Sequence, residues 1–425
     1  MREMKDSGIK WIGLIPSAWR TARVKNVAET MQSGGTPDSS NDTFYVDIEG
    51  GIPWVAIADM STTPYVKDTN KHISEEGRKS KNLIVFEPGT ILYAMYASVG
   101  KVSELAVPAT INQALLAIVL NSSIDGSFFK YALNAWEPYI ISESNGTTQF
   151  NLNANKVANL CFPMPNRLEQ ESIVRYLDTK CAQVDTLIAN VQAQIEKLKA
   201  YKQSLITEVV TKGLDHTVPM KDSGVAWIGE IPAHWEIKRG KVLFEESDAR
   251  SADGSEELLT VSQYTGITPR SQKNVNMFEA LTLEGYKLCD VGDIAANTMW
   301  LWAGAIGVSA YSGVISPSYN VYRQKAENFV PSYLDCLLRA PMLVQEYASR
   351  STGIRASRLR LYPKDFLDIM FPVPPVDEQQ DIMSVLSEKF AAVDKLIAIK
   401  KSKIEKLEQY KKSLIYEYVT GKKEA

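Results

Sequence analysis

Ile195-Glu196-Lys197-Leu198 and Ser204-Leu205-Ile206 return in the same chain as Ile404-Glu405-Lys406-Leu407 and Ser413-Leu414-Ile415. The two copies lie 404 − 195 = 209 positions apart. The same offset also relates earlier pairs: Phe162-Pro163-Met164-Pro165 and Phe371-Pro372-Val373-Pro374, Glu169-Gln170 and Glu378-Gln379, and Val184-Asp185 and Val393-Asp394. A repeat of this length indicates that the chain is duplicated, which is the first fact that any fold must satisfy.

A second repeat opens each half of the chain. Met4-Lys5-Asp6-Ser7-Gly8 with Trp11-Ile12-Gly13 returns as Met220-Lys221-Asp222-Ser223-Gly224 with Trp227-Ile228-Gly229, an offset of 220 − 4 = 216. Between the repeats, residues 20–145 and 236–352 look unrelated. The chain therefore alternates constant and variable segments. It is expected to fold into a structure with pseudo-twofold symmetry and two different functional surfaces.

The constant segments after each Phe-Pro motif predict long helices, because apolar residues recur there in a heptad seam with 4–3 spacing. Asn166 followed by Glu169 is a typical helix start, and Gly213 and Gly421 stand where helix ends are expected. The pattern allows a break near Lys180. The seam residues are Val184, Ile188, Val191, Ile195, Leu198, Leu205 and Val209 in the first copy, and Val393, Ile397, Ile404, Leu407, Leu414 and Tyr418 in the second, with Lys202, Lys400 and Lys411 as interruptions.

Such a seam favours pairing of the two helices in antiparallel, coiled-coil-like fashion; the alternative is that each helix covers only its own domain. The variable regions mix short apolar runs with turns. Strands are predicted at 52–57, 90–96, 114–120 and 294–296, and helices at 128–135 and 333–347. The predicted fold is thus two copies of an α/β (mixed α+β) domain, at 1–160 and 216–368, joined by helical spacers at 161–215 and 369–425.

Composition limits the class of protein. The chain has 425 residues, enough for two or more domains, and a formal net charge of −3, which does not by itself favour nucleic-acid binding. The four cysteines and three histidines show no zinc-ligand spacing. No secretion signal or apolar run of about 18 residues is seen, so a cytoplasmic protein without a membrane span is expected.

The sharpest local signal is a basic segment at the end of the second variable region. Residues 349–364 contain no acidic residue. Arginine forks bind phosphates and the guanine edge, whereas amide side chains suit adenine, so the matching positions of the two copies are predicted to contact different bases. The candidate DNA-binding residues are Arg350, Arg355, Arg358, Arg360, Tyr362 and Lys364, and, in the first copy, Thr148, Gln149 and Asn151. A solvated basic face is the plainer alternative.

Motifs for catalysis are missing from the sequence. No P-loop, no [ND]-P-P-[YF] motif and no convincing nucleophile–base constellation occurs. Ser33-Gly34-Gly35-Thr36-Pro37 lacks the ending of a P-loop and predicts a turn. The paired tryptophans of the opening repeat are expected to fill cores. A duplicated chain without a catalytic motif is expected to bind and assemble.

The order of these motifs resembles that of the specificity subunits of type I restriction–modification enzymes. The resemblance covers essentially the whole chain. It is carried by Trp11–Trp19 and Trp227–Trp235, Ser33–Pro37, Ile52–Val55, Gly89-Thr90-Ile91 and Gly292-Asp293-Ile294, Gly146–Gln149, and the Phe-Pro to Glu-Gln junctions. Thr352-Gly353-Ile354-Arg355 departs from the common pattern of the family.

The resemblance implies two target recognition domains that each contact half of a split site in double-stranded DNA, and helices that set the gap and dock two modification subunits. It also implies that no cofactor binds this chain: S-adenosylmethionine belongs to the modification subunits, and ATP with Mg to the restriction subunits. Two other readings remain open. The chain could be a scaffold with two peptide-binding domains, or a methyltransferase with its own recognition domains.

Overall fold

The computed structural model describes residues 2–47, 50–60, 64–96, 98–143, 152–273, 282–353 and 359–425. The chain divides into two compact units: unit 1 comprises Met1–Val191 with Ser402–Ala425, and unit 2 comprises Gln192–Lys401. Each unit therefore holds one variable domain together with a part of each predicted helical spacer. Among the described residues, no helix is both long enough and apolar enough to cross a bilayer.

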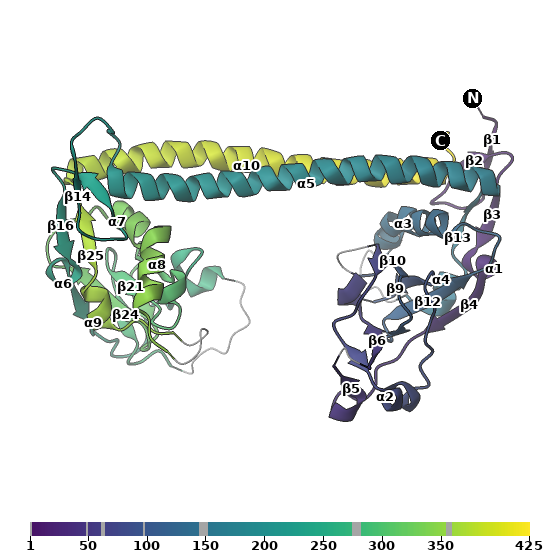
Figure 1. Ribbon diagram of the computed structural model, residues 1–425, viewed down its shortest axis with the longest axis horizontal. Coiled ribbons are helices and arrows are strands. Elements are labelled where there is room, and N and C mark those ends of the chain that lie inside the picture. Colours follow the sequence, from purple (N-terminus) through teal and green to yellow (C-terminus); the bar gives the residue numbers. More distant parts are fainter. Residues whose placement is uncertain are drawn as a thin grey trace. The chain divides into compact units, whose positions relative to one another are not determined.

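Two long helices form the constant part of the chain (Figure 1). Helix α5 spans Arg167–Lys212 and helix α10 spans Val376–Val419, which confirms both predicted helices. Helix α5 continues through Lys180 without a break. Gly213 and Gly421 follow the two helix ends with φ angles of 72° and 70°, the left-handed conformation that a glycine cap supplies.

The helices pack antiparallel in both units, and the lysines that interrupt the seam explain the register. In unit 1 the Lys411 ammonium lies 2.6 Å from a carboxylate oxygen of Asp185, and in unit 2 Lys202 lies 2.8 Å from Asp394. The two ion pairs are related by the 209-residue offset, since 185 + 209 = 394 and 202 + 209 = 411. Polar groups at seam positions contribute little energy but select one register.

The seam residues lie between the helices as their spacing predicts. Val184, Val191, Ile195, Leu205, Val393 and Leu414 are buried, and Ile188, Leu198, Ile397, Ile404 and Leu407 are half-buried. Each end of the helix pair also joins the core of a variable domain. In unit 1, Leu414 and Tyr418 of α10 pack with Leu177 of α5, and in unit 2 Leu205 of α5 packs with Leu386 of α10.

The variable domain of unit 1 is built on a five-stranded sheet with the order β4-β12-β9-β10-β7. Its strands are β4 (Ala28–Ser33), β7 (Tyr65–Val66), β9 (Ile91–Ala94), β10 (Val102–Leu105) and β12 (Leu115–Leu120). A second sheet has the order β11-β6-β8-β5: β5 (Tyr45–Val46), β6 (Ile52–Val55), β8 (His72–Ile73) and β11 (Thr110–Ile111). Helices α1 (Val24–Val27), α2 (Glu75–Ser80), α3 (Gly126–Glu143) and α4 (Ala154–Ala158) complete the domain, with 3-10 turns at Asp42–Phe44 and Ile57–Met60.

The variable domain of unit 2 repeats the central strand order although its sequence differs. Its four-stranded sheet runs β17-β24-β21-β22, which corresponds to β4-β12-β9-β10. The strands are β17 (Phe244–Ser247), β21 (Ile294–Ala296), β22 (Ile306–Val308) and β24 (Asn320–Gln324), with smaller pairs β18 (Leu259–Ser262) with β19 (Gly266–Pro269) and β20 (Lys287–Cys289) with β23 (Gly313–Ile315). The domain also contains helices and short 3-10 turns. The helices are α6 (Gly240–Leu243), α7 (Pro331–Leu338), α8 (Pro341–Arg350) and α9 (Pro363–Leu367), and the 3-10 turns are η3 (Arg270–Gln272) and η4 (Leu301–Ala303).

The predicted strands at 52–57, 90–96, 114–120 and 294–296 are confirmed as β6, β9, β12 and β21 with shorter bounds. The prediction of a single helix at 333–347 was wrong. Two helices, α7 and α8, occupy this segment, because Pro341 lacks an amide hydrogen and starts a new helix instead of continuing the first. The helix predicted at 128–135 is the middle of the longer α3.

The opening repeats form matching hairpins that support each variable domain. In unit 1, β1 (Met4–Asp6) pairs with β2 (Leu14–Pro16), and β3 (Arg20–Arg23) pairs with β13 (Cys161–Met164). The counterparts in unit 2 are β14 (Met220–Asp222) with β15 (Glu230–Pro232), and β16 (Glu236–Arg239) with β25 (Met370–Val373). Trp19 and Trp235 are buried beside these hairpins, as core tryptophans should be.

Gly421 and Gly8 offer a matched test of how tightly α10 packs on the first hairpin. Both residues have a φ of 70°. A Cβ on Gly421 would lie 2.5 Å from Pro16 Cδ, whereas nothing lies within 4 Å at Gly8. We expect Gly8→Ala to lower the free energy of unfolding by about 1 kcal/mol through backbone strain, and Gly421→Ala by roughly 2–4 kcal/mol, because the crowded methyl adds an overpacking cost. Chemical denaturation followed by circular dichroism measures both. Equal losses would contradict the close packing at Gly421.

Candidate nucleic-acid interface

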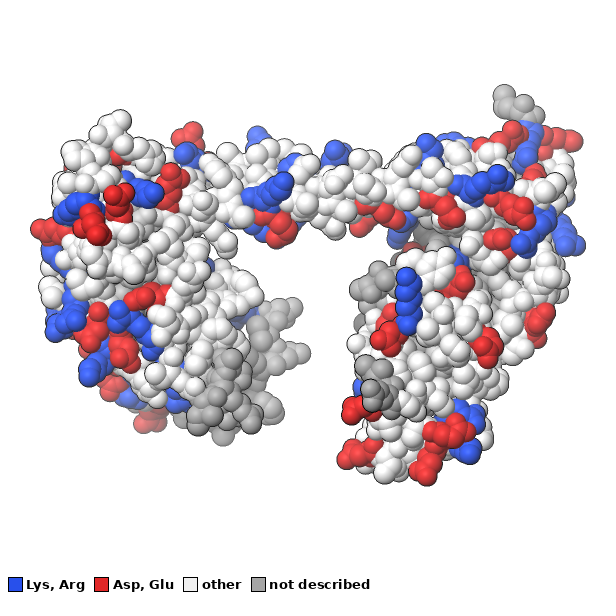
Figure 2. Space-filling model, in the orientation of Figure 1, with Lys and Arg blue, Asp and Glu red and all other residues white. Residues whose placement is uncertain are grey.

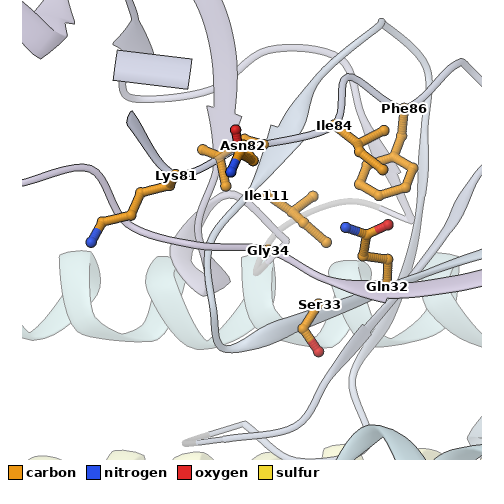
Figure 3. Close-up of a pocket in the computed structure, with 9 residues that line it drawn as sticks. Gln32, Ser33, Gly34, Lys81, Asn82, Ile84, Phe86 and Ile111 are labelled. Carbon is orange, nitrogen blue, oxygen red and sulfur yellow. The ribbon is translucent and has the colours of Figure 1, made fainter. Parts of the chain in front are cut away.

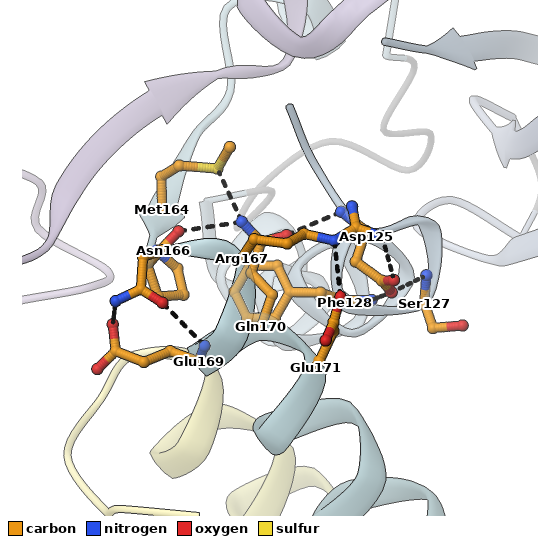
Figure 4. Close-up of polar contacts among 10 residues, drawn as sticks. Asp125, Ser127, Phe128, Met164, Asn166, Arg167, Glu169, Gln170 and Glu171 are labelled. Atoms are coloured by element: carbon orange, nitrogen blue, oxygen red, sulfur yellow. Dashed lines mark hydrogen bonds and ion pairs between the residues drawn. The ribbon is translucent and has the colours of Figure 1, made fainter. Parts of the chain in front are cut away.

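Each variable domain is tied to its helix by the Glu-Gln pair of the repeat (Figure 4). Gln170 is buried near the start of α5, where its Oε1 accepts a hydrogen bond of 2.8 Å from the Asp125 amide. Its Nε2 donates to the Pro165 carbonyl at 3.0 Å. The Asp125 carboxylate in turn accepts from the amides of Ser127 and Phe128 at the start of α3. One side chain therefore joins the scaffold helix α5 to the start of helix α3 in the variable domain.

Unit 2 has the same contact in the same geometry. We call it the Glu-Gln joint, formed by Glu169-Gln170 in unit 1 and by Glu378-Gln379 in unit 2. Gln379 accepts from the Val330 amide at 2.8 Å, just before α7, and donates to the Pro374 carbonyl at 2.9 Å. The preceding glutamate holds the buried tryptophan in both units: Trp19 Nε1 donates to Glu169 at 3.1 Å, and Trp235 Nε1 donates to Glu378 at 2.9 Å. Buried polar groups that are fully bonded specify one geometry, so each variable domain is held rigidly on its scaffold.

Five of the predicted DNA-binding residues lie outside the described residues. They are Thr148, Gln149 and Asn151 in the first copy, and Arg355 and Arg358 in the second. Their predicted roles stay predictions. The flanking residues that the structure describes, Leu152, Thr352 and Arg360, make defined backbone contacts within their units.

The described members of the basic segment lie at the end of α8, before α9 and in the first turn of α9, where Lys364 is placed. Thr352 and Arg360 exchange two backbone hydrogen bonds, both of 2.9 Å. Arg360, Tyr362 and Lys364 are exposed, as a DNA-contacting residue must be. Arg350 is the last residue of α8, and its Nε donates to a Glu346 carboxylate oxygen at 2.6 Å.

Arg350 pairs with an acidic residue that lies outside the basic segment 349–364. Glu346 lies just before the segment 349–364, but one helical turn brings it beside Arg350. Part of the local positive charge is therefore neutralised. On the face of the protein in Figure 2, Lys and Arg are interspersed with Asp and Glu over both units, in keeping with the net charge of −3. On this face, charges of both signs are therefore mixed among the described residues, without a large basic field.

Ser33 ends strand β4, and Gly34 and Gly35 continue it as irregular chain packed on Ile111, so the structure assigns no turn to this motif. The Gly35 amide donates to the Ile111 carbonyl at 3.0 Å, and a Cβ on Gly34 would overlap that same carbonyl oxygen. Amides that already bond a strand cannot cradle a phosphate. The adjoining cavity measures about 50 Å³. Figure 3 shows the Gln32 amide next to Phe86 and Ile111, with the Lys81 side chain pointing away. A space of this size does not hold a nucleotide.

Three of the four cysteines, Cys181, Cys289 and Cys336, are poor nucleophiles. Burial raises the pKa of the Cys289 thiol to about 12 and that of Cys336 to about 11. Burial also raises the pKa of Cys181, which lies on α5. Since the thiolate is the reactive form, these three residues are structural. Among the described residues, no three His, Cys, Asp or Glu side chains gather in a way that would hold a metal ion.

One flank of the helix pair carries exposed apolar residues that do not belong to the heptad seam. In unit 1 they are Leu187 and Tyr410, and in unit 2 Tyr201 and Leu396, each about half exposed. Leu187 and Leu396, like Tyr201 and Tyr410, are related by the 209-residue offset. All four precede a seam residue by one position, the heptad g position, and in an antiparallel pair the g positions of both helices lie on the same flank. The signal was present in the sequence as repeated apolar residues outside the seam.

Comparison with known proteins agrees with this architecture. The model of the type I restriction modification DNA specificity domain matches residues 16–197. The putative type I restriction enzyme MjaX specificity subunit of Methanocaldococcus jannaschii is 24% identical, over 97% of this chain and 95% of that protein. The type I restriction enzyme EcoBI specificity subunit of Escherichia coli is 22% identical, over 93% of this chain and 84% of that protein.

A solved structure of a type I R-M system, from work on its complex assembly and conformational transition, has a TM-score of 0.62 and 15% identity, and covers 95% of this chain and 98% of that chain. At this identity the likeness shows the fold alone. The chain is therefore similar over most of its length to type I restriction enzyme specificity subunits, and residues 16–197 match the DNA specificity domain of those proteins.

Proposed function

We propose that this chain recognises a split target in double-stranded DNA, with each variable domain reading one half and the helix pair setting the gap. The observation that carries the proposal is the shared strand order of two domains with unrelated sequences, each fastened to the scaffold by the same Glu-Gln joint. A duplicated scaffold that presents two different surfaces is suited to two different half-sites.

The length of the helices supports a spacer role. The seam extends over about 30 residues, and an α-helix rises about 1.5 Å per residue, so the seam is roughly 45 Å long. Half-sites one helical turn apart are separated by about 34–36 Å from centre to centre. A helix pair of this length is of the right order to span such a gap.

The apolar flank of the helices is suited to docking two modification subunits. Leu187 with Tyr410 in unit 1, and Leu396 with Tyr201 in unit 2, form two equivalent patches of the aliphatic and aromatic type that protein interfaces favour. Two equivalent patches accept two copies of one partner. In this proposal the modification subunits supply the S-adenosylmethionine chemistry, restriction subunits supply the ATP- and Mg-dependent steps, and the complex acts in the cytoplasm.

The docking role predicts that Leu187→Asp combined with Leu396→Asp weakens assembly with the modification subunit at least tenfold, because two buried charges would replace two apolar contacts. Both side chains are exposed in the isolated chain, so the variant should fold. Pull-down titration with the modification subunit measures the effect. Ala193→Asp, at an exposed position of the outer helix face, is the control and should bind normally. Equal binding by all three proteins would contradict the docking role.

The proposed function is tested by sequencing methylated adenines in DNA from cells that express this chain with its modification subunit. We expect a split motif, in which two short specified blocks flank a gap of constant length. An assembled complex that methylates no defined motif would overturn the proposal and favour a peptide-binding scaffold. Methylation of a single uninterrupted motif would contradict the division of labour between the two domains.

A further inference from the structure

The loop that joins β21 to β22 presents two tryptophans at the surface of unit 2. Trp300 is 49% exposed, and its ring stacks on that of Trp302 with the centroids 5.8 Å apart and an interplanar angle of 25°. The adjacent Met299 is 45% exposed. Tryptophans of the opening repeat, by contrast, are buried at Trp19 and Trp235. The exposed Trp300 ring, backed by the half-buried Trp302 ring, has an apolar surface that is available to a ligand.

The loop holds this surface in a defined conformation. Leu301, between the two tryptophans, is fully buried and anchors the 3-10 turn η4 in the core. Trp302 Nε1 donates to the Met299 carbonyl at 3.0 Å, and Thr298 Oγ1 donates to the Ser318 carbonyl at 2.7 Å. Gly304 closes the turn in the left-handed conformation. The exposed rings are therefore preorganised, which lowers the entropic cost of any contact that they make.

The loop lies against helix α8, whose last residue, Arg350, is one of those predicted to contact DNA. Turn η4 packs against α8, where a Cβ on Gly304 would lie 3.1 Å from a methyl of Val344. Helix α8 ends at Arg350, two residues before the Thr352–Arg360 bridge. The exposed side chains that follow, Arg360 and Lys364, are cationic and suit a phosphate-bearing ligand better than an apolar protein surface.

Unit 1 has the same arrangement with a smaller aromatic group. Its corresponding hairpin, β9–β10, accepts a hydrogen bond at the Met95 carbonyl from the amide of Leu152, at 3.2 Å. Leu152 directly follows the segment that contains Gln149 and Asn151. The next residue of that hairpin, Tyr96, is 36% exposed. In both units the same hairpin loop thus contacts a residue or helix that borders a predicted DNA-binding segment, and it exposes an aromatic side chain.

We propose that Trp300 and Trp302 form an apolar wedge that packs into a base step of the half-site bound by unit 2. This inference rests on the proposed function and adds the element that deforms the DNA. Apolar side chains that enter a base step unstack it and bend the duplex, and flexible pyrimidine–purine steps cost least to deform. The wedge therefore contributes specificity at a step where no base edge is hydrogen-bonded, and more strongly in unit 2 than Tyr96 does in unit 1.

The test uses the complete complex of this chain with its modification subunits and the target defined by methylation sequencing. The fluorescent base 2-aminopurine replaces each adenine of the two half-sites in turn. We expect the wild-type complex to raise its fluorescence at one step of the half-site bound by unit 2, since unstacking relieves quenching. Trp300→Ala should abolish this signal and weaken binding about tenfold, the scale of one stacking contact, whereas Trp300→Phe should retain most of both.

Val291→Ala is the matched control, because Val291 is an exposed apolar residue that precedes β21 at the other end of the hairpin. It should leave both the signal and the binding unchanged. Wild-type binding and unstacking by Trp300→Ala would overturn the wedge. Loss of modification-subunit assembly in Trp300→Ala would also overturn it and identify a protein interface. A wild-type complex with no split motif would instead refute the proposed function, which keeps the two failures distinguishable.

Discussion

A chain in which α5 and α10 are each lengthened by one heptad is expected to direct methylation to a split motif whose gap is about three base pairs longer. Seven helical residues add about 10.5 Å, and the DNA rises about 3.4 Å per base pair. The specified blocks should not change, because the variable domains and their Glu-Gln joints are untouched. Sequencing of methylated adenines measures the gap and the blocks in one experiment.

The position of the insertion follows from the antiparallel register. A second copy of Gln192–Leu198 is placed after Val191, and a second copy of Ser402–Glu408 is placed after Lys401. These sites separate the parts of the two helices that belong to unit 1 from those that belong to unit 2. The ion pairs Lys411–Asp185 and Lys202–Asp394 then keep their partners, because each pair lies within one unit.

The control is a four-residue insertion after Val191 in α5 alone. It shifts the heptad of one helix against the other, so the seam and the ion pairs cannot both be kept, and we expect loss of defined methylation instead of a simple change in the gap. If the protein with a heptad inserted in each helix assembles normally but still directs methylation to targets with the original gap, the spacer role of the helices is refuted.

The replacement Trp235→Ala is expected to lower the free energy of unfolding of unit 2 by roughly 3–5 kcal/mol, the usual cost of deleting a fully buried large side chain. The Trp235 side chain is 0% exposed and packs in the core that joins both helices to the second variable domain. Its Nε1 also donates to Glu378 at 2.9 Å, so the variant leaves a partly buried carboxylate without that donor.

Trp300→Ala provides the comparison for Trp235→Ala, because the same side chain is removed from an exposed site of the same unit. We expect it to change the free energy of unfolding by less than about 1 kcal/mol. Differential scanning calorimetry of both variants and the wild-type protein measures the difference. Similar destabilisation by the two replacements would contradict the burial of Trp235 and would also disqualify Trp300→Ala as a probe of DNA contacts.

Much of the scaffold could be predicted because it rests on local and periodic signals. The heptad spacing predicts both helices, and Gly213 and Gly421 mark their ends through a conformation that glycine adopts without strain. The strand order of the variable domains could not be predicted, since short apolar runs do not specify which strands pair. The prediction of a single helix at 333–347 was wrong for a local reason, because Pro341 starts a second helix there.

The candidate site was predicted less well than the scaffold. The sequence locates the basic segment but not the pairing of Arg350 with Glu346, which depends on the end of α8. It identifies the Glu-Gln pair as a repeat, yet not as a joint, because Gln379 contacts Val330 across 49 residues of chain. Trp300 and Trp302 were overlooked because tryptophan is usually buried, and only their exposure distinguishes them.

By itself, the sequence determined that this protein is duplicated, that two long helices carry a seam suited to antiparallel pairing, and that it resembles DNA specificity subunits. Those conclusions follow from repetition and periodicity, which are properties of the order of residues along the chain. The tertiary structure alone decided that two unrelated sequences share one strand order, which lysines pair with which aspartates, and which aromatic rings remain exposed. Burial and pairing arise from contacts between residues far apart in sequence, and no local pattern records them.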